Sequence, residues 1–328
     1  MQAIPAPAFL FNLCAGYFAP RCLHLVAQLG VADVLGNTPM SSEDLARATG
    51  AHADSLHRMM RMLSSTGVFE RRGNGWAHTD YSEHLKVSHP HSLRSFVLMM
   101  GNDLNWNAAG ALGVTLRTGE TAAEVVSPGG LWPYLRAHPE DARIFDAAMI
   151  SKSHMAIGAV LQGLDFTRYE HIADIAGGRG HILSAILDAA PRAQGTLFDL
   201  PDVVANSLAH PRMKKHPGDF FVGPLPRADA YLVSNILHDW LDPQAISILR
   251  HIREVAPAHA ELLVLEMMLP EGPEPHPAVV MDLIMLSLAG GRERTQGQYD
   301  ALFAEGGFKL DRIISTHSPY SILVGKVA

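Results

Sequence analysis

Apolar residues recur every three to four positions in the first part of the chain, the spacing of helices that bury one face. This pattern predicts helices over residues 20–36, 41–50 and 54–67, and a glycine closes each of them. Ser41 and Asp44 match the capping box that starts a helix. The chain is therefore expected to open with a cluster of short amphipathic helices.

Residues 68–79 form two short runs of strand-forming residues on either side of Asn74-Gly75, a dipeptide typical of hairpin turns. Helices followed by a two-stranded wing make up the winged-helix arrangement, which we predict for residues 1–95. Winged helices often bind DNA, and basic residues lie on the predicted third helix. Methionine and leucine crowd the same helix, however, which favours a dimerisation or scaffold role.

A second helical region, residues 96–165, carries Phe, Met and Trp at helical spacing, and we predict a helical bridge there. From residue 166 onward, short apolar runs alternate with amphipathic helical segments, which predicts a doubly wound, mostly parallel α/β sheet. The last two strands flank Pro319 too closely for a crossover, so one of them should run antiparallel. The predicted strands cover residues 171–177, 195–201, 228–237, 260–269, 308–318 and 320–327.

Composition narrows the classes of function. The 328 residues are 48% hydrophobic and 18% charged, which suits a chain with a large buried core. A formal net charge of −7 argues against nucleic acid as the main partner, because phosphate binding needs a basic surface. No uncharged apolar run of about 18 residues occurs, so we expect no membrane span. Cys14 and Cys22 match no zinc or redox pattern and are expected to be buried free thiols of a cytoplasmic protein.

A glycine-rich turn, residues 174–180 (DIAGGRG), follows the first strand of the predicted sheet. Ligands of such sheets bind beyond the carboxyl ends of the strands, where glycines let the backbone approach them closely. The turn lacks the third glycine of a dinucleotide fingerprint and the lysine of a phosphate loop. Asp199, at the end of the second strand, can accept ribose hydroxyls, and Asp219 and Phe220 suit an adenine amine and ring. This set fits S-adenosylmethionine better than a dinucleotide.

Six motifs stand in order along the chain: DIAGGRG, FDLPDVV, GDFF, NILHDW, LEMMLP and GGRERT. In this order and spacing they resemble the S-adenosylmethionine-dependent O-methyltransferases of the caffeate, hydroxyindole and bacterial polyketide-tailoring type. The resemblance covers essentially the whole chain. It implies a Rossmann-like methyltransferase domain over residues 166–328, a homodimer formed through the N-terminal domain, and S-adenosylmethionine as methyl donor. The implied reaction is methylation of a hydroxyl on an aromatic small molecule of secondary metabolism.

The resemblance also implies a set of cofactor-binding residues. Ala176 departs from the family pattern, which usually has glycine at this point. Alanine requires a negative φ there, which a strand end allows, so we expect cofactor binding to survive. Ser234 stands where plant members often carry a lysine, a change expected to weaken or rearrange one cofactor contact. The implied residues are Asp174, Gly177, Gly178, Asp199, Leu200, Asp219, Phe220 and Ser234.

His238, in NILHDW, follows a predicted strand on the ligand side of the sheet, and the resemblance implies that it is the general base. A phenol with a pKa of about 10 is only about one-thousandth ionised at about pH 7, so a nearby base favours methylation. The alternative is a buried histidine bonded to backbone. Family members place Glu266 and Glu293 around this histidine, where they fix its tautomer and stabilise its charged form. Asp239 is expected to point elsewhere.

For the acceptor, the resemblance implies contacts with Phe145, Met149, Asp282 and Met285. Composition alone predicts that the phenylalanine and both methionines belong to the core. Asp282 is a carboxylate in an apolar helix, and it contacts either a polar group of the acceptor or a backbone amide. No cluster of His, Cys and Asp at metal-ligand spacing occurs, so no metal is expected.

The sequence leaves three alternative functions open. The first is methylation of nitrogen or carbon, which needs no base when the acceptor already has a free lone pair. The second is a non-methylating reaction of a protein that binds S-adenosylmethionine, such as a pericyclization or a hydroxylation. The third is a winged-helix regulator that senses a small ligand.

Overall fold

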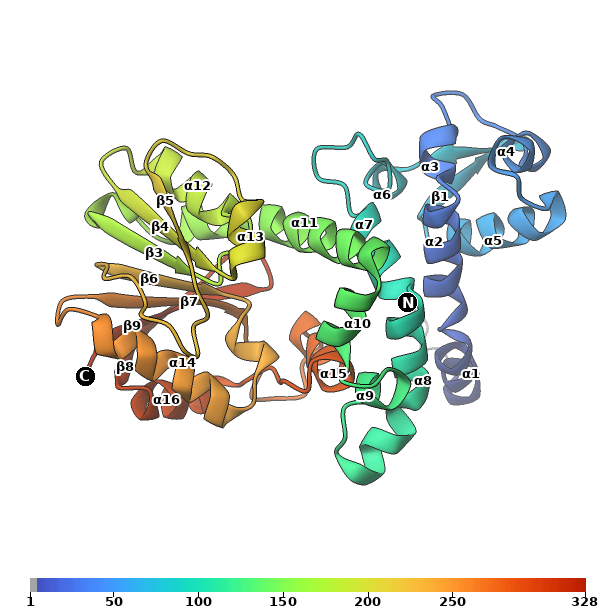
Figure 1. The fold of residues 1–328 in the computed structure, drawn as a ribbon. Coiled ribbons are helices and arrows are strands. Elements are labelled where there is room, and N and C mark those ends of the chain that lie inside the picture. The colour runs from blue at the N-terminus through green and yellow to red at the C-terminus, as the bar shows by residue number, and fades with distance from the viewer. Residues whose placement is uncertain (1–4) are drawn as a thin grey trace. The chain divides into compact units, whose positions relative to one another are not determined.

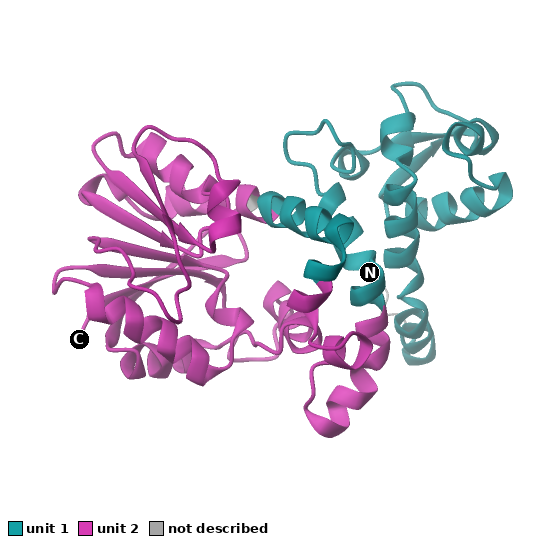
Figure 2. Cartoon of the chain, viewed as in Figure 1, with its two compact units in different colours: residues 1–106, 135–151 teal, residues 107–134, 152–328 magenta. Residues whose placement is uncertain are grey.

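The computed structural model describes residues 5–328, and its helices and strands are labelled in Figure 1. The chain divides into two compact units, coloured in Figure 2. The predicted bridge over residues 96–165 is shared by the two units, and helix α11 (Pro139–Gly163) passes from one into the other. Unit 1 comprises the residues up to 106 together with 135–151, and unit 2 comprises 107–134 together with 152–328.

The first helical segment of unit 1 differs from its prediction. In place of one helix over residues 20–36, the chain forms α2 (Phe18–Gln28) and the single turn α3 (Val31–Val34). Gly30, between them, adopts a left-handed φ of 67°, a conformation that glycine reaches without steric cost. This residue ends α2 and redirects the chain.

The wing follows α4 (Ser42–Thr49) and α5 (Ala53–Ser65), which form close to where they were predicted. Its strands, β1 (Phe69–Arg72) and β2 (Gly75–His78), pair antiparallel. The turn residues are Gly73 and Asn74, one position earlier than the predicted Asn74-Gly75, because Gly73 takes the positive φ of 59°.

Helix α5, the helix that would enter DNA in a winged-helix regulator, packs within its own unit. Met60 is completely buried. His57 Nδ1 lies 2.9 Å from Ser42 Oγ in a hydrogen bond, and Arg58 forms an ion pair with Asp54 at 2.9 Å. These engaged side chains support the dimerisation or scaffold interpretation over DNA recognition.

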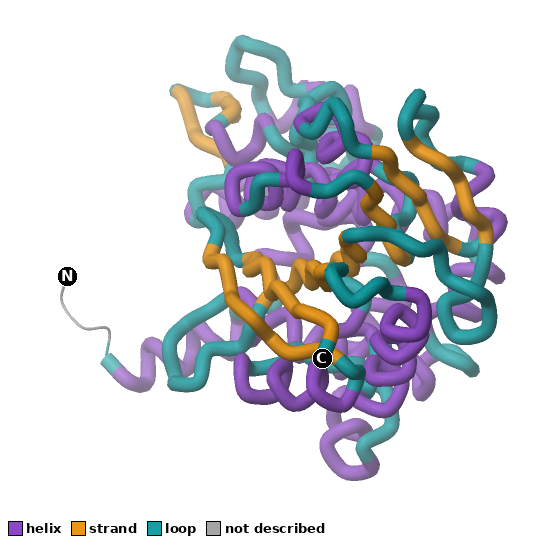
Figure 3. The backbone as a smooth tube through the Cα atoms, turned by 90° about the vertical axis from the view of Figure 1, so that its left-hand side faces the viewer, coloured by secondary structure: helices purple, strands orange, loops and turns teal. Residues whose placement is uncertain are grey.

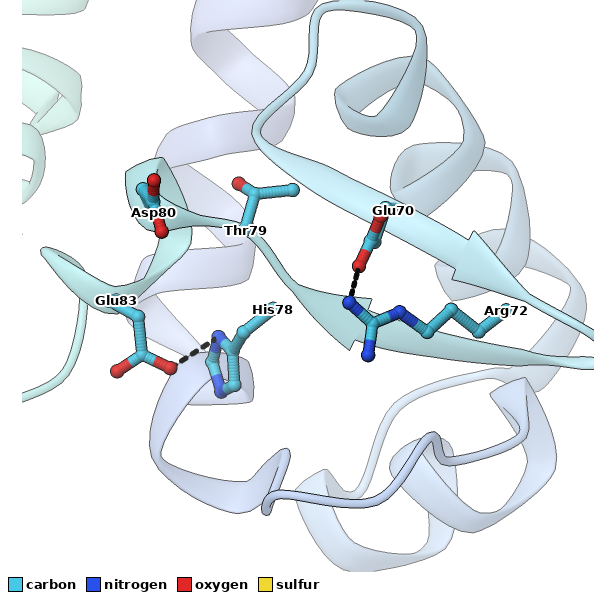
Figure 4. Close-up of a pocket in the computed structure, with 6 residues that line it drawn as sticks. All are labelled: Glu70, Arg72, His78, Thr79, Asp80 and Glu83. Atoms are coloured by element: carbon cyan, nitrogen blue, oxygen red, sulfur yellow. Dashed lines mark ion pairs between the residues drawn. The ribbon is translucent and has the colours of Figure 1, made fainter.

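A surface hollow beside the wing carries acidic as well as basic side chains (Figure 4). Arg72 pairs with Glu70, and His78 Nδ1 lies 3.9 Å from Glu83 Oε1. A phosphate backbone needs unpaired positive charge, so this hollow is unsuited to nucleic acid. Its lining residues are Glu70, Arg72, His78, Thr79, Asp80 and Glu83.

Helix α1 (Ala6–Ala15) exposes large apolar side chains, among them Phe11 at 73% and Leu13 at 67%. Both cysteines are free, but Cys14 is exposed and Cys22 is half-buried, so the expectation of two buried thiols is wrong. The remaining helices before α11 are α6 (Asp80–Glu83), α7 (Arg94–Gly101), α8 (Asp103–Thr118), α9 (Ala122–Val126) and α10 (Leu131–Ala137).

Two helical stretches, residues 6–28 and 139–163, are long and apolar enough to cross a membrane by length and composition alone. Both stretches contain charged residues, such as Arg21 in the first and Lys152 in the second, so the expected absence of a membrane span is not contradicted and stays a prediction. The finding is weak evidence for a membrane span, since core helices of soluble proteins meet the same criterion.

Unit 2 contains the predicted doubly wound sheet, whose strands lie side by side with helices on both sides (Figure 3). The strand order is β5-β4-β3-β6-β7-β9-β8, and β9 runs antiparallel to both its neighbours, as the short connection at Pro319 predicts. The strands are β3 (His171–Ile175), β4 (Gln194–Asp199), β5 (Met213–Pro217), β6 (Ala230–Ser234), β7 (Glu261–Met267), β8 (Phe308–Ser315) and β9 (Tyr320–Val327).

Each face of this sheet has its own apolar core, because successive side chains of a strand point to opposite faces. Along β3, Ile172 packs with α12 (His181–Ala189) and the end of α11, whereas Ala173 packs with α14 (Asp242–Val255) and α16 (Gln296–Glu305). Burial on both faces explains why the sequences of the parallel strands are continuous runs of apolar residues. The other helical segments of unit 2 are the 3-10 turns η1 (Phe166–Arg168) and η2 (Leu237–Asp239), α13 (Pro201–Ala205) and α15 (Pro277–Leu288).

The turn after β3 overturns the expectation about Ala176. Its φ is +54°, not negative. In this left-handed region the Cβ of an L-residue crowds the following carbonyl oxygen, a cost that glycine avoids. The alanine at this position is therefore a source of local backbone strain.

We predict that Ala176→Gly raises the free energy of unfolding by about 1 kcal/mol, because glycine adopts a positive φ without this crowding. Urea denaturation of the full chain measures the change. Asn235→Gly is the matched control, since Asn235 has the same φ of 54° but asparagine tolerates this region better. A loss of stability in Ala176→Gly, or an equal gain in both variants, would contradict this account.

Candidate active site

Site residues predicted from the sequence gather at one edge of the sheet. Strands β5, β4, β3, β6 and β7 are parallel, so their carboxyl ends meet at this edge. Asp174 lies near the end of β3, Asp199 ends β4, Ser234 ends β6, and Glu266 lies near the end of β7. The topology thus brings together residues that are up to 92 positions apart in the chain (266 − 174).

The glycine turn is packed against a buried acid. Asp174 is 1% exposed, and neither of its carboxylate oxygens has a hydrogen-bond partner in the described part of the chain. Burial, reinforced by the charge of Asp199, raises the pKa of Asp174 to about 8. A Cβ added to Gly177 would lie 2.4 Å from Asp174 Oδ2, so only glycine fits beside this carboxyl group.

Asp199 is held by the backbone of both neighbouring turns. Its Oδ2 accepts the amide N–H of Gly178 at 2.8 Å, and its Oδ1 accepts that of Leu200 at 2.7 Å. Burial raises the pKa of Asp199, and these two amide hydrogen bonds lower it. Leu200 itself is 52% exposed, so its side chain is available to a ligand at this edge.

The remaining predicted cofactor residues also lie after strands of this sheet. Asp219 Oδ1 accepts the amide N–H of Phe221 at 2.8 Å, which fixes the turn after β5. Phe220 lies edge-on to Trp240, with 6.2 Å between ring centroids. Ser234 Oγ accepts from the side-chain amide of Asn235 at 3.2 Å.

His238 lies in the 3-10 turn η2 and is 3% exposed. Its Nδ1 is 2.7 Å from Glu293 Oε1, a hydrogen bond between two buried side chains. Burial lowers the pKa of His238 and raises the pKa of Glu293 to about 8. The charge on Glu293 then decides the tautomer of the His238 ring. Ionised Glu293 accepts the Nδ1–H of the ring and leaves Nε2 without a proton. Protonated Glu293 donates its own proton to Nδ1, so the ring proton lies on Nε2.

Glu266 holds the turn that carries His238. Its Oε1 accepts the amide N–H groups of Ile236, Leu237 and His238, at 3.1, 2.7 and 3.3 Å. Its Oε2 accepts the hydroxyl of Tyr299 at 2.9 Å and lies 4.0 Å from His238 Nδ1. The structure therefore brings both predicted acids to His238, but only Glu293 bonds to its ring.

The loop that carries Glu293 is fixed against η2 by its neighbours. Arg294, 1% exposed, donates to Asp242 Oδ1 at 2.7 Å and to the carbonyls of Leu237 and Trp240, both at 2.8 Å. A Cβ on Gly291 would lie 2.0 Å from the carbonyl oxygen of His238, so the loop can approach η2 only with glycine there.

Asp239 does not point away from His238, contrary to the expectation. Its Oδ1 lies 3.6 Å from His238 Nε2, the nitrogen on the other side of the ring from Glu293. The 3-10 turn causes this proximity, because its tight winding brings neighbouring side chains closer than an extended strand end would. Burial raises the pKa of Asp239, and the positive charges of His238 and Lys152 lower it.

The predicted acceptor residues fall into both units. Phe145 and Met149 are half-buried on the part of α11 that belongs to unit 1. Met285, on α15 in unit 2, is 8% exposed. Asp282 Oδ1 accepts the backbone N–H of Glu293 at 2.9 Å, so of its two expected contacts the structure shows the backbone amide.

His238, Glu266 and Glu293 each offer one ligand atom within 4.8 Å of the others, a spacing that a metal ion could use. In this chain the same atoms are hydrogen-bonded to one another, to backbone amides and to Tyr299. A metal would have to displace those bonds, and the absence of a metal stays a prediction.

Sequence reasoning missed Lys152, Tyr299 and Tyr320. Lys152 is buried, and its charge acts on His238, Asp239 and Glu293. Tyr320 has a buried hydroxyl without a hydrogen-bond partner among the described residues. One signal was available for Lys152, because it is the sole lysine in the long, largely apolar segment that forms α11.

Comparisons with known proteins identify the family. A family model for the O-methyltransferase domain matches residues 112–309, and one for the O-methyltransferase dimerisation domain matches residues 11–88. Phenazine O-methyltransferase PhzM of Lysobacter antibioticus is 37% identical over 98% of this chain and 96% of its own length. An 8-amino-8-demethylriboflavin N,N-dimethyltransferase of Streptomyces davaonensis is 33% identical over 88% of this chain and 86% of its own length.

A solved structure agrees with these matches. A methyltransferase in calicheamicin biosynthesis, in its S-adenosylhomocysteine-bound form, is 32% identical and superposes with a TM-score of 0.90 over 100% of both chains. The resemblance inferred from the six motifs is thereby confirmed. The chain belongs to the family of S-adenosylmethionine-dependent O-methyltransferases that act on aromatic small molecules in secondary metabolism.

Proposed function

We propose that this enzyme methylates a hydroxyl group of an aromatic small molecule, with His238 as the general base. The hydrogen bond between His238 Nδ1 and Glu293 Oε1 carries the proposal, because ionised Glu293 leaves Nε2 free to accept a proton. The relative that is a phenazine O-methyltransferase supports this class of acceptor.

The proposed proton transfer uses the two sides of the imidazole ring. Glu293 holds the Nδ1–H, and Nε2 takes the proton from the acceptor hydroxyl. The positive charge that forms on the ring is stabilised by Glu266 and Asp239, whose charges favour protonated His238. A base in this position typically accelerates such a reaction by roughly 10²–10⁴-fold.

The residues at the glycine turn fit S-adenosylmethionine. Asp174 has two buried oxygens without partners, and the close packing of Gly177 and the amide of Gly178 shape the turn beside it. Asp199, Leu200, Asp219, Phe220 and Ser234 complete the proposed cofactor set at the same edge of the sheet. When bound, the cofactor supplies an activated methyl group, and its transfer leaves S-adenosylhomocysteine and a methyl ether.

Phe145, Met149, Asp282 and Met285 remain proposed acceptor-binding residues, supported by the family resemblance. For Asp282 the hydrogen bond to the amide of Glu293 supports a second role, because it holds the loop that presents Glu293 to His238. A change at Asp282 is therefore expected to act on the base as well as on the acceptor.

We also propose that the enzyme is a cytoplasmic homodimer without nucleic-acid or membrane partners. The match of residues 11–88 to a dimerisation domain supports the dimer. The exposed apolar side chains of α1, such as Phe11, support an interface there, because a second copy would remove them from water.

Methylation of nitrogen is the second candidate, favoured by the relative that is an N,N-dimethyltransferase. An amine with a free lone pair needs no base. Activity toward an amine acceptor that survives replacement of His238 would support this candidate.

We predict that His238→Ala lowers kcat for a hydroxylated acceptor by roughly 10²–10⁴-fold, because the proton acceptor is lost. The affinity for S-adenosylhomocysteine, measured by calorimetry, should stay nearly unchanged. His259→Ala, which removes an exposed histidine bonded to Asp229, is the matched control. Unchanged turnover in His238→Ala would exclude His238 as the base.

The charge on Glu293 should make kcat/KM depend on pH. Glu293 must be ionised for Nε2 to accept a proton, and burial raises its pKa to about 8. The rate of the wild type should therefore rise as pH increases through about 8. Glu293→Gln should remove this rise and lower kcat by roughly ten- to a hundredfold, whereas the exposed Glu305→Gln should do neither. A wild-type profile that falls through this range would contradict the assignment.

Cofactor binding should depend on pH through Asp174. Its pKa of about 8 means that the unliganded protein holds this carboxyl largely protonated at neutral pH. If the ionised form binds the cofactor, affinity for S-adenosylhomocysteine should rise as pH increases toward about 8. Asp174→Asn should reduce this pH dependence relative to wild type and to the exposed control Asp202→Asn. Identical pH profiles for wild type and Asp174→Asn would rule out a cofactor role for the ionised carboxylate.

A further inference from the structure

Lys152 is a buried cation without a fixed partner. It lies on the part of α11 that belongs to unit 2 and is 8% exposed. Among the described residues, no hydrogen bond or ion pair within 4.0 Å engages its ammonium group. An ammonium group that no side chain binds directly is available to form charge-assisted hydrogen bonds with a negatively charged ligand.

The ammonium group of Lys152 is close enough to the acids around His238 for their charges to act on it. The charges that act on Lys152 are those of Asp239, Glu293 and Glu266, and burial lowers its pKa. Neither Asp174 nor Asp199, at the glycine turn, contributes. The charges that act on Lys152 are therefore those of the acids around His238.

The other charged groups of this cluster are already engaged. Glu266 accepts four hydrogen bonds, from three backbone amides and from Tyr299. Glu293 is bonded to His238, and Arg294 is bonded to Asp242 and two carbonyls. Of the cations that act on His238, Lys152 is the one whose donors are uncommitted within the described chain.

We propose, building on the proposed function, that Lys152 is a specificity-determining residue that binds a carboxylate next to the hydroxyl being methylated. A carboxylate supplies the full negative charge that an unpartnered ammonium lacks, and the pair forms charge-assisted hydrogen bonds. An aromatic hydroxyl beside a carboxylate donates to it internally, which holds its proton. Binding of that carboxylate by Lys152 releases the hydroxyl to face His238 Nε2.

The test compares two probes that share a ring system. The full chain, loaded with S-adenosylhomocysteine, is titrated calorimetrically with 3-hydroxy-2-naphthoate and with 2-naphthol, which lacks the carboxylate. The wild type should bind the naphthoate roughly ten- to a hundredfold more tightly, as expected for a buried charge-assisted contact. Lys152→Met should lose this preference, and Lys152→Arg, which keeps the charge, should retain part of it.

Lys309→Met, a change at an exposed lysine of β8, is the matched control and should keep the full preference. Lys152→Met should also keep the wild-type affinity for S-adenosylhomocysteine. The proposal is overturned if the wild type shows no preference, if Lys152→Met keeps it, or if this variant loses affinity for S-adenosylhomocysteine instead.

Because this readout is binding, its failure is distinguishable from failure of the proposed function. A preference for the naphthoate that depends on Lys152 supports the present inference whether or not the probe is methylated. Retained methylation of hydroxylated acceptors in His238→Ala contradicts the proposed base and leaves the role of Lys152 standing.

Discussion

The hydrogen bond between His238 Nδ1 and Glu293 Oε1 is the interaction on which the rest of the site depends. It joins a turn after β6 to a loop after α15, two segments that are far apart in the sequence. Both partners are buried, so each would be costly without the other. Around this bond, Glu266 fixes the turn, Arg294 fixes the loop, and the lack of a side chain at Gly291 lets the two approach.

The α/β sheet explains why such a bond can form. Parallel strands bring their carboxyl ends to one edge, and apolar cores on both faces hold these strands in place. The glycine turn occupies the same edge, next to the strand that leads to His238. The proposed cofactor residues and the proposed base are thus positioned by neighbouring strands of one sheet.

Much of this arrangement could be predicted from the sequence. Alternating strand and helix patterns place Asp174, Asp199 and His238 at strand ends, and the topology then brings them together. What could not be predicted depends on local backbone geometry and on side-chain packing. The left-handed φ of Ala176 and the approach of Asp239 to His238 follow from turns whose winding no periodicity reveals.

The burial of Lys152 could not be predicted from the sequence either. A lysine in a helix is ordinarily solvent-exposed, and the pattern of α11 does not say which of its faces is buried. Its burial, and the three carboxylates whose charges act on it, become visible only in the folded unit 2. The family motifs also leave it unmarked, because they lie on the sheet edge and its loops.

The central claim is that Glu293 holds His238 in the tautomer that can accept a proton. Nitrogen NMR of the labelled His238 ring, followed across the neutral and alkaline pH range, tests it most directly. The account predicts that above about pH 8, where Glu293 is ionised, Nδ1 carries the proton and Nε2 is bare. A proton that remains on Nε2 throughout this range would contradict the account, because such a ring could not act as the base.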